Sequence, residues 1–135
     1  LEFVRELDGV RFYNDSKATN SDAAKQALKS FETPIILLAG GYAKEFDYSH
    51  LAKLVDERVR ICCLFGRDRE KLFKDLNCEN KSTFIFDTLD QALERAVEIA
   101  QPGENVLLSP MCASFDQYTS FEERGQHFKN LVNKL

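Results

Sequence analysis

The sequence predicts a single doubly wound α/β domain, in which helices cover both faces of a mostly parallel, Rossmann-like sheet. Short apolar runs alternate with helical patterns from one end of the chain to the other. Most of these runs are apolar almost throughout, as is typical of strands buried on both faces of a parallel sheet. No linker, repeat or low-complexity segment interrupts the alternation, so we expect residues 1–135 to form one domain.

Six segments are expected to form the strands. Four of them are short and apolar: Pro34–Ala39, Arg60–Phe65, Thr83–Phe86 and Asn105–Leu108. A fifth, Val10–Asn14, alternates in polarity and leads directly into a polar loop. The Asp8-Gly9 turn before it is typical of a hairpin, so residues 1–7 are expected to add an antiparallel edge strand.

Helical spacing of apolar residues fills the gaps between these runs. The clearest pattern starts at Leu89, where Thr88 and Gln91 predict a capping box, and it ends at Pro102-Gly103. The last pattern starts near Ser120, with Glu123 as the expected box partner. Three further stripes mark the other helices: Ala23–Phe31, Leu51–Val55 and Leu72–Leu76.

Composition and charge exclude several classes of protein. The chain is 44% hydrophobic and 30% charged, and it has no apolar run long enough to cross a membrane and no signal-peptide pattern. Its net charge of −4 argues against a general nucleic-acid or anionic-membrane surface. The four cysteines are expected to be free, buried thiols in a reducing cytoplasm: Cys62, Cys63, Cys78 and Cys112. Cys62 and Cys63 are neighbours in a strand and point to opposite faces, which argues against a redox pair. Only His50 and His127 could add further ligands, which argues against a zinc site.

Three polar loops follow expected strands and are expected to lie along one rim, at the carboxyl ends where such sheets bind ligands. The loops are Asn14–Ser21, Gly40–Asp47 and Ser109–Ser120. Each polar residue also has an ordinary structural explanation. A hydroxyl or amide near residue 20 can cap the next helix, a Gly pair can make a turn, and a loop lysine is usually solvated. Taken together, two lysines, several hydroxyls and new helix N-termini on one rim predict an anion site.

The rim contains no recognisable catalytic centre. The chain has no P-loop, no G-x-S-x-G elbow, no Cys-His arrangement and no carboxylates with metal-ligand spacing. We therefore expect it to hold an anionic ligand and to lack catalytic and metal-ligating residues of its own.

Three motifs in these loops resemble those of a known family. They are N-D-S-K-A-T-N, G-G-x-x-K-x-x-D-[FY] and L-L-S-P-x-C-A-S-x-D-x-[FY]-x-x-F-x-x-R-G. In this order they are similar to the C-terminal domain of the D-glutamate-adding Mur ligases, ATP-dependent enzymes of peptidoglycan synthesis. Other Mur ligases typically have D-Y-A-H-x-P at the first motif, where this chain has Asp15-Ser16-Lys17-Ala18-Thr19-Asn20. The match extends over the whole chain.

The resemblance implies a division of labour between domains. In the family an N-terminal domain binds the UDP-sugar, and a central domain holds ATP and Mg²⁺. The C-terminal domain, which this chain resembles, brings in D-glutamate. ATP converts the carboxylate of UDP-N-acetylmuramoyl-L-alanine to an acyl phosphate, and the amine of D-glutamate attacks it. The resemblance thus implies a monomeric, cytoplasmic ligase whose isolated C-terminal domain is inactive.

The resemblance also assigns residues. Five are expected to hold D-glutamate: Thr19, Lys44, Ser114, Phe115 and Phe121. Two are expected to face ATP across the cleft: Asp15 and Lys17. A lysine with hydroxyl and backbone donors is a suitable complement for a ligand with two carboxylates. The alternative function is a stand-alone α/β module that binds a nucleotide or acidic metabolite without catalysis.

Overall fold

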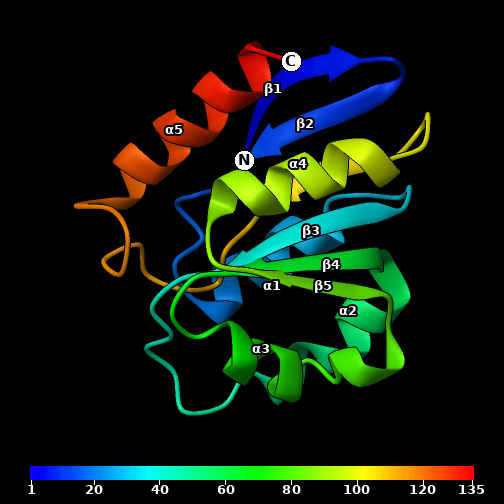
Figure 1. The fold of residues 1–135 in the computed structure, drawn as a ribbon. Helices are drawn as coiled ribbons and strands as arrows, with labels where there is room; N and C mark the ends of the chain where they lie inside the picture. Colours follow the sequence, from blue (N-terminus) through cyan, green and yellow to red (C-terminus); the bar gives the residue numbers. More distant parts are fainter.

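The computed structural model describes residues 1–135 and contains one six-stranded sheet in the order β1-β2-β6-β3-β4-β5. Only the β1–β2 pair is antiparallel, and every other neighbouring pair is parallel. This confirms the predicted sheet and its edge hairpin (Figure 1). The strands are β1 (Glu2–Leu7), β2 (Val10–Asn14), β3 (Ile35–Gly40), β4 (Val59–Phe65), β5 (Thr83–Phe86) and β6 (Asn105–Leu108).

Helices cover both faces of the sheet, also as predicted (Figure 1). One face carries α1 (Ser21–Lys29), α2 (Ala52–Arg58) and α3 (Arg69–Asp75), and the other carries α4 (Leu89–Ile99) and α5 (Phe121–Asn133). Two short 3₁₀ turns, η1 (Ser49–Leu51) and η2 (Cys78–Asn80), lead into α2 and β5 respectively. None of these helices is long and apolar enough to cross a membrane.

The core lies on both sides of β3, in which every residue is buried. Successive strand residues point to opposite faces, so Leu37 packs towards α1 and α2 while Leu38 packs towards α4 and α5. The same alternation places Cys62 in the first cluster and Cys63 in the second, as expected from the sequence. The prediction was wrong for β5. This strand is only half buried, because it forms the free edge of the sheet.

Helix caps match the sequence patterns with one exception. The Thr88–Gln91 capping box is present, and the Asn20 side chain caps α1 by accepting from Ala23 N at 2.9 Å. Ser120 caps α5 through Glu123 N, but the Glu123 carboxylate accepts from the N–H and hydroxyl of Thr119 instead of from Ser120 N. The predicted box at α5 is therefore displaced by one residue, because Thr119 offers the carboxylate two donors.

The topology brings the three polar loops to one end of the sheet. β2, β6 and β3 are adjacent and parallel, so the chain leaves all three strands at the same edge. From there α1 follows β2 onto one face, whereas α5 follows β6 onto the opposite face. Divergence of neighbouring connections at this point is the arrangement that opens a crevice for ligands in α/β sheets.

Candidate functional site

Backbone hydrogen bonds join the three loops into one rim, defined here as Asn14–Ser21, Gly40–Asp47 and Ser109–Ser120. Asp15 N donates to Leu108 O at 2.7 Å, which ties the first loop to the end of β6. Tyr42 and Ala113 exchange N–H···O bonds of 2.8 and 2.9 Å, forming an isolated bridge between the second and third loops. The predicted grouping of the loops is therefore confirmed.

The glycine pair after β3 is required by close backbone approach. Gly40 has φ +152° and Gly41 φ +128°, values that side-chain-bearing residues rarely adopt. A Cβ on Gly40 would lie 1.9 Å from Phe65 O, and one on Gly41 would lie 2.3 Å from Ala113 O. The pair lets the second loop pass tightly between β4 and the third loop, so it does more than turn the chain.

Lys44 lies in the second loop with its side chain free. The residue is exposed, and its ammonium forms no hydrogen bond or ion pair within the protein. Its Nζ lies 5.9 Å from the centre of the Phe115 ring, so the structure brings together two of the residues expected to hold D-glutamate. The Phe115 ring is itself 65% exposed, and a ligand that approaches Lys44 would therefore meet it.

The first loop contributes one anchored and two free side chains. Asp15 is buried, and its Oδ2 accepts a hydrogen bond of 3.0 Å from Ser109 Oγ. Lys17 is exposed and Thr19 half buried, and neither side chain bonds to another part of the protein. Asp15 thus supports the rim, whereas Lys17 and Thr19 are available to a ligand.

Phe121 and Ser114 are positioned by the loops around them. Phe121 opens α5, and its carbonyl accepts from Ser16 Oγ at 2.7 Å, which holds it against the first loop. Ser114 is 2% exposed, and its hydroxyl forms no hydrogen bond within the protein. Of the polar residues expected to contact ligands, four form no side-chain hydrogen bond within the protein: Lys17, Thr19, Lys44 and Ser114.

Arg124, on α5, contacts the rim from outside it. The third sequence motif ends in Arg124-Gly125, but the sequence assigned this arginine no role. It is completely buried, and burial lowers the pKa of its guanidinium to about 10. Nε donates to Ser16 Oγ at 2.9 Å, and Nη2 donates to Ser16 O at 2.9 Å and Cys112 O at 3.1 Å. Nη1 has no partner, and a Cβ on Gly41 would lie 3.2 Å from it. One side chain therefore meets all three loops.

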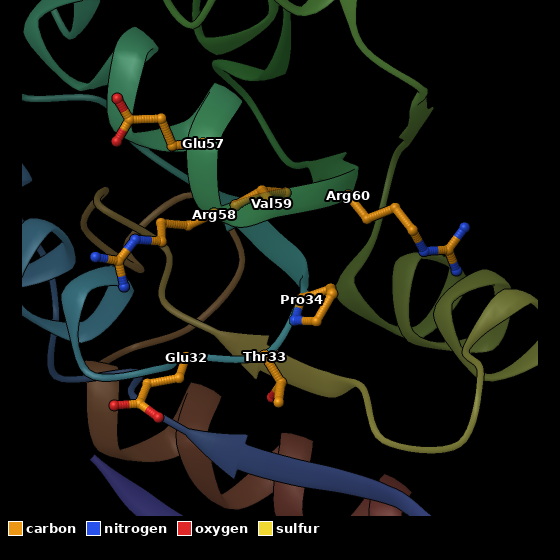
Figure 2. Close-up of a pocket in the computed structure, with 7 residues that line it drawn as sticks. All are labelled: Glu32, Thr33, Pro34, Glu57, Arg58, Val59 and Arg60. Atoms are coloured by element: carbon orange, nitrogen blue, oxygen red, sulfur yellow. The ribbon is translucent and has the colours of Figure 1, made fainter.

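Several hollows are lined by arginine or lysine side chains, and one of them lies beside the first loop of the rim. A groove of about 350 Å³ runs between the first loop and α5, where Asp15, Lys17 and Phe121 line it. A second hollow lies at the amino ends of β3 and β4, between Glu32 and Arg60 (Figure 2). It is at the opposite end of the sheet, and both of its arginines bond to the protein: Arg58 to Phe31 O and Arg60 to Glu104.

Potential metal ligands are scattered in this domain. The structure brings together no group of three His, Cys, Asp or Glu side chains that could hold a metal ion. The rim's free groups are cations and hydroxyls, which suit carboxylates or phosphates.

Comparison with known proteins identifies the family of this chain. Residues 1–112 match the family described as "Mur ligase, glutamate ligase domain". The chain belongs to the Mur ligase family. It is 48% identical over its whole length to the UDP-N-acetylmuramoylalanine–D-glutamate ligase of Caldicellulosiruptor saccharolyticus, and 46% identical to that of Salinibacter ruber. The chain spans 30% and 29%, respectively, of the length of these relatives.

Solved structures share the fold of this Mur ligase domain at low sequence identity. A domain from Haemophilus ducreyi, described as part of a UDP-N-acetylmuramate:L-alanyl-γ-D-glutamyl-diaminopimelate ligase, superposes with a TM-score of 0.65 at 14% identity, and 98% of each chain is covered. Escherichia coli FolC, solved with ADP, superposes with a TM-score of 0.61 at 18% identity, covering 97% of this chain and 31% of FolC. At these identities the likeness establishes the fold.

Proposed function

We propose that this Mur ligase domain binds D-glutamate in a longer ATP-dependent ligase that adds it to UDP-N-acetylmuramoyl-L-alanine during peptidoglycan synthesis. The observation that carries the proposal is the set of unpaired cations and hydroxyls that lie on one rim. Relatives that are 43–48% identical to this chain are named as this ligase, which supports D-glutamate as its substrate.

D-glutamate carries a carboxylate at each end, and the three loops offer complementary groups. Lys44 would pair with one carboxylate, and the hydroxyls of Thr19 and Ser114 would donate to the carboxylate oxygens. Phe115 and Phe121 would contact the carbon chain and limit its movement. Fixing the amine of D-glutamate in one orientation is the main contribution such a domain can make to the rate of amide formation.

The groove beside Asp15 and Lys17 would face ATP. When bound with Mg²⁺, ATP supplies the phosphoryl group that activates the acceptor carboxylate. An exposed lysine without a protein partner suits the charge of a phosphate, and Asp15 would remain anchored by Ser109. Nucleotide and metal would be held mainly by a separate ATPase domain. Because its substrates are a nucleotide sugar and ATP, we infer that the ligase is cytoplasmic, and we expect a monomer.

Substitution of Lys44 tests this proposal. In the full-length protein, Lys44→Ala should raise the KM for D-glutamate about thirtyfold or more, because loss of a charged hydrogen bond in a closed site costs about 2–5 kcal/mol. The KM values for ATP and the UDP-sugar should stay unchanged. Lys53→Ala, which removes an exposed lysine on α2, is the matched control. An unchanged glutamate KM in Lys44→Ala would reject the assignment, and ligand binding without ADP release would favour a module that only binds.

A further inference from the structure

Glu45 makes a contact that links the lysine loop to the start of α1. Its Oε2 accepts a hydrogen bond of 2.7 Å from Ser21 N, and its Oε1 accepts one of 2.5 Å from Ser21 Oγ. Ser21 is the first residue of α1 and is 3% exposed. A carboxylate at this position satisfies a helix N–H that lacks an intrahelical partner and interacts favourably with the helix dipole.

The backbone of Lys44 is therefore fixed by contacts of the residues before and after it. On one side, Ala43 N donates to Asp68 Oδ2 at 2.7 Å. On the other, the Glu45 carboxylate bonds to Ser21. The Lys44 side chain takes no part in either contact, so the backbone is fixed while the ammonium remains free. Ser21 also lies two residues after Thr19, so the same contact sets the spacing between two side chains proposed to bind D-glutamate.

The Ser21 hydroxyl extends this contact to a third segment. It lies 3.0 Å from His50 Nε2 in η1. The hydroxyl has one proton, which it donates to Glu45, so it accepts a hydrogen bond from the protonated Nε2 of His50. The second loop, α1 and η1 therefore meet at one buried hydroxyl.

We infer that Glu45 is a positioning residue for glutamate binding, a role that rests on the proposed function of Lys44. Its carboxylate does two things. It fixes the Lys44 backbone relative to Thr19, and because it is committed to Ser21 it stays away from the neighbouring ammonium. A Glu45 carboxylate released from Ser21 would compete with the substrate carboxylate for Lys44.

Kinetics of two Glu45 variants in the full-length protein test the inference. Glu45→Ala should raise the KM for D-glutamate about tenfold, because misplacing Lys44 weakens one charge-assisted hydrogen bond to the substrate carboxylate. It should leave kcat and the KM for ATP within about twofold. Glu45→Gln keeps an acceptor for Ser21 N and should recover most of the loss. Glu57→Ala, an exposed glutamate at the opposite end of the sheet, is the control. A wild-type KM in Glu45→Ala would overturn the inference.

A double variant shows whether Glu45 acts through Lys44. In the Lys44→Ala background, Glu45→Ala should add no further increase in glutamate KM, since the group it positions is gone. An additive increase would overturn the positioning role. If Lys44→Ala raises the KM and Glu45→Ala does not, the inference alone fails. If Lys44→Ala has no effect, the assignment of Lys44 and the role of Glu45 fail together. Should Glu45→Ala be too unstable to assay, Glu45→Asp replaces it, because the shorter side chain withdraws the carboxylate from both Ser21 donors. An unchanged glutamate KM in that variant would also overturn the inference.

Discussion

Arg124 and Ser16 lie 108 residues apart in the chain, yet the Arg124 guanidinium donates to both the side-chain and the backbone oxygen of Ser16. Both residues are buried, and Arg124 also reaches Cys112 O. Ser16 in turn donates to Phe121 O. The first and third loops of the rim are thus joined through α5 by charged hydrogen bonds that are shielded from water.

Replacing Arg124 should destabilise the domain. Arg124→Leu leaves three buried acceptors on Ser16 and Cys112 without this donor, and we expect the free energy of unfolding to fall by about 3 kcal/mol. Arg124→Lys should recover little, because an ammonium cannot reproduce the planar fork of donors. Urea denaturation, monitored by circular dichroism, measures the free energy of unfolding of both variants. Gln126→Ala, on the exposed face of α5, is the control. A loss below about 0.5 kcal/mol, typical of surface substitutions, would contradict this.

Lys17 should affect the use of ATP, whereas Lys44 should affect the binding of D-glutamate. We expect Lys17→Ala in the full-length protein to lower kcat about a hundredfold, the scale of removing one group that stabilises charge on a transferred phosphate. The KM for D-glutamate should not change. Initial rates with ATP and D-glutamate varied in turn separate the two effects, and Lys25→Ala on α1 is the control. An effect confined to the glutamate KM would instead assign Lys17 to glutamate binding.

The sheet and the location of the rim could be predicted because they depend on periodic or topological signals. Runs such as Ile35–Gly40 are buried on both faces, so burial itself selects their apolar residues. Asp8-Gly9 specifies the hairpin through turn chemistry, and both residues have positive φ. Once the strands are parallel, their carboxyl ends fall on one edge, which groups the loops without further information.

The contacts inside the rim could not be predicted in this way. Arg124 falls on the buried face of an amphipathic helix, where a pattern of apolar residues gives no sign that a charged residue is buried. Glu45 bonds to Ser21 only because two loops from different strands approach each other. The exposure of β5 depends on its place at the edge of the sheet, which the short sequence Thr83–Phe86 does not reveal. The assignments of Thr19, Lys44 and Ser114 to D-glutamate stay predictions.

The cysteines should be reduced and unreactive in the folded protein. All four are free and at most 1% exposed, and burial raises the pKa of Cys63 and of Cys112 to about 12. Little thiolate therefore forms at Cys63 and Cys112 at neutral pH. A hydrogen bond with Cys62 lowers the pKa of Cys78, but this residue is only 1% exposed. Burial should therefore make a disulfide reagent react slowly with the native chain, and the reagent should find four thiols after unfolding. Fewer than four thiols in a sample kept without oxidant would contradict the prediction, as would fast reaction of the native protein.

The last prediction concerns the ion pair between Arg60 and Glu104. Glu104 is 5% exposed, and its carboxylate accepts from Arg60 Nε at 2.5 Å, Arg60 Nη2 at 2.8 Å and Gln101 N at 2.8 Å. Burial by itself would raise the pKa of Glu104, but the hydrogen bonds from Arg60 and Gln101 outweigh it, so the pKa is lowered. The folded state therefore favours the ionised carboxylate. Its stabilising effect is complete above the unfolded pKa of about 4.3 and is lost as the pH falls through the lower folded value.

Glu104→Gln should remove this pH dependence. At pH 7 we expect the variant to be about 2 kcal/mol less stable than the wild type, because a charge-assisted pair becomes a neutral one with Arg60 left uncompensated. The difference should shrink as the pH falls from about 4 through the lower folded pKa, because the wild-type carboxylate becomes protonated over this range. Urea denaturation at a series of pH values gives the stability of the wild type and of the variant as a function of pH. Glu79→Gln, which replaces an exposed glutamate without a side-chain partner, is the control. A difference that is constant between pH 7 and pH 3 would show that ionisation of Glu104 contributes nothing to stability.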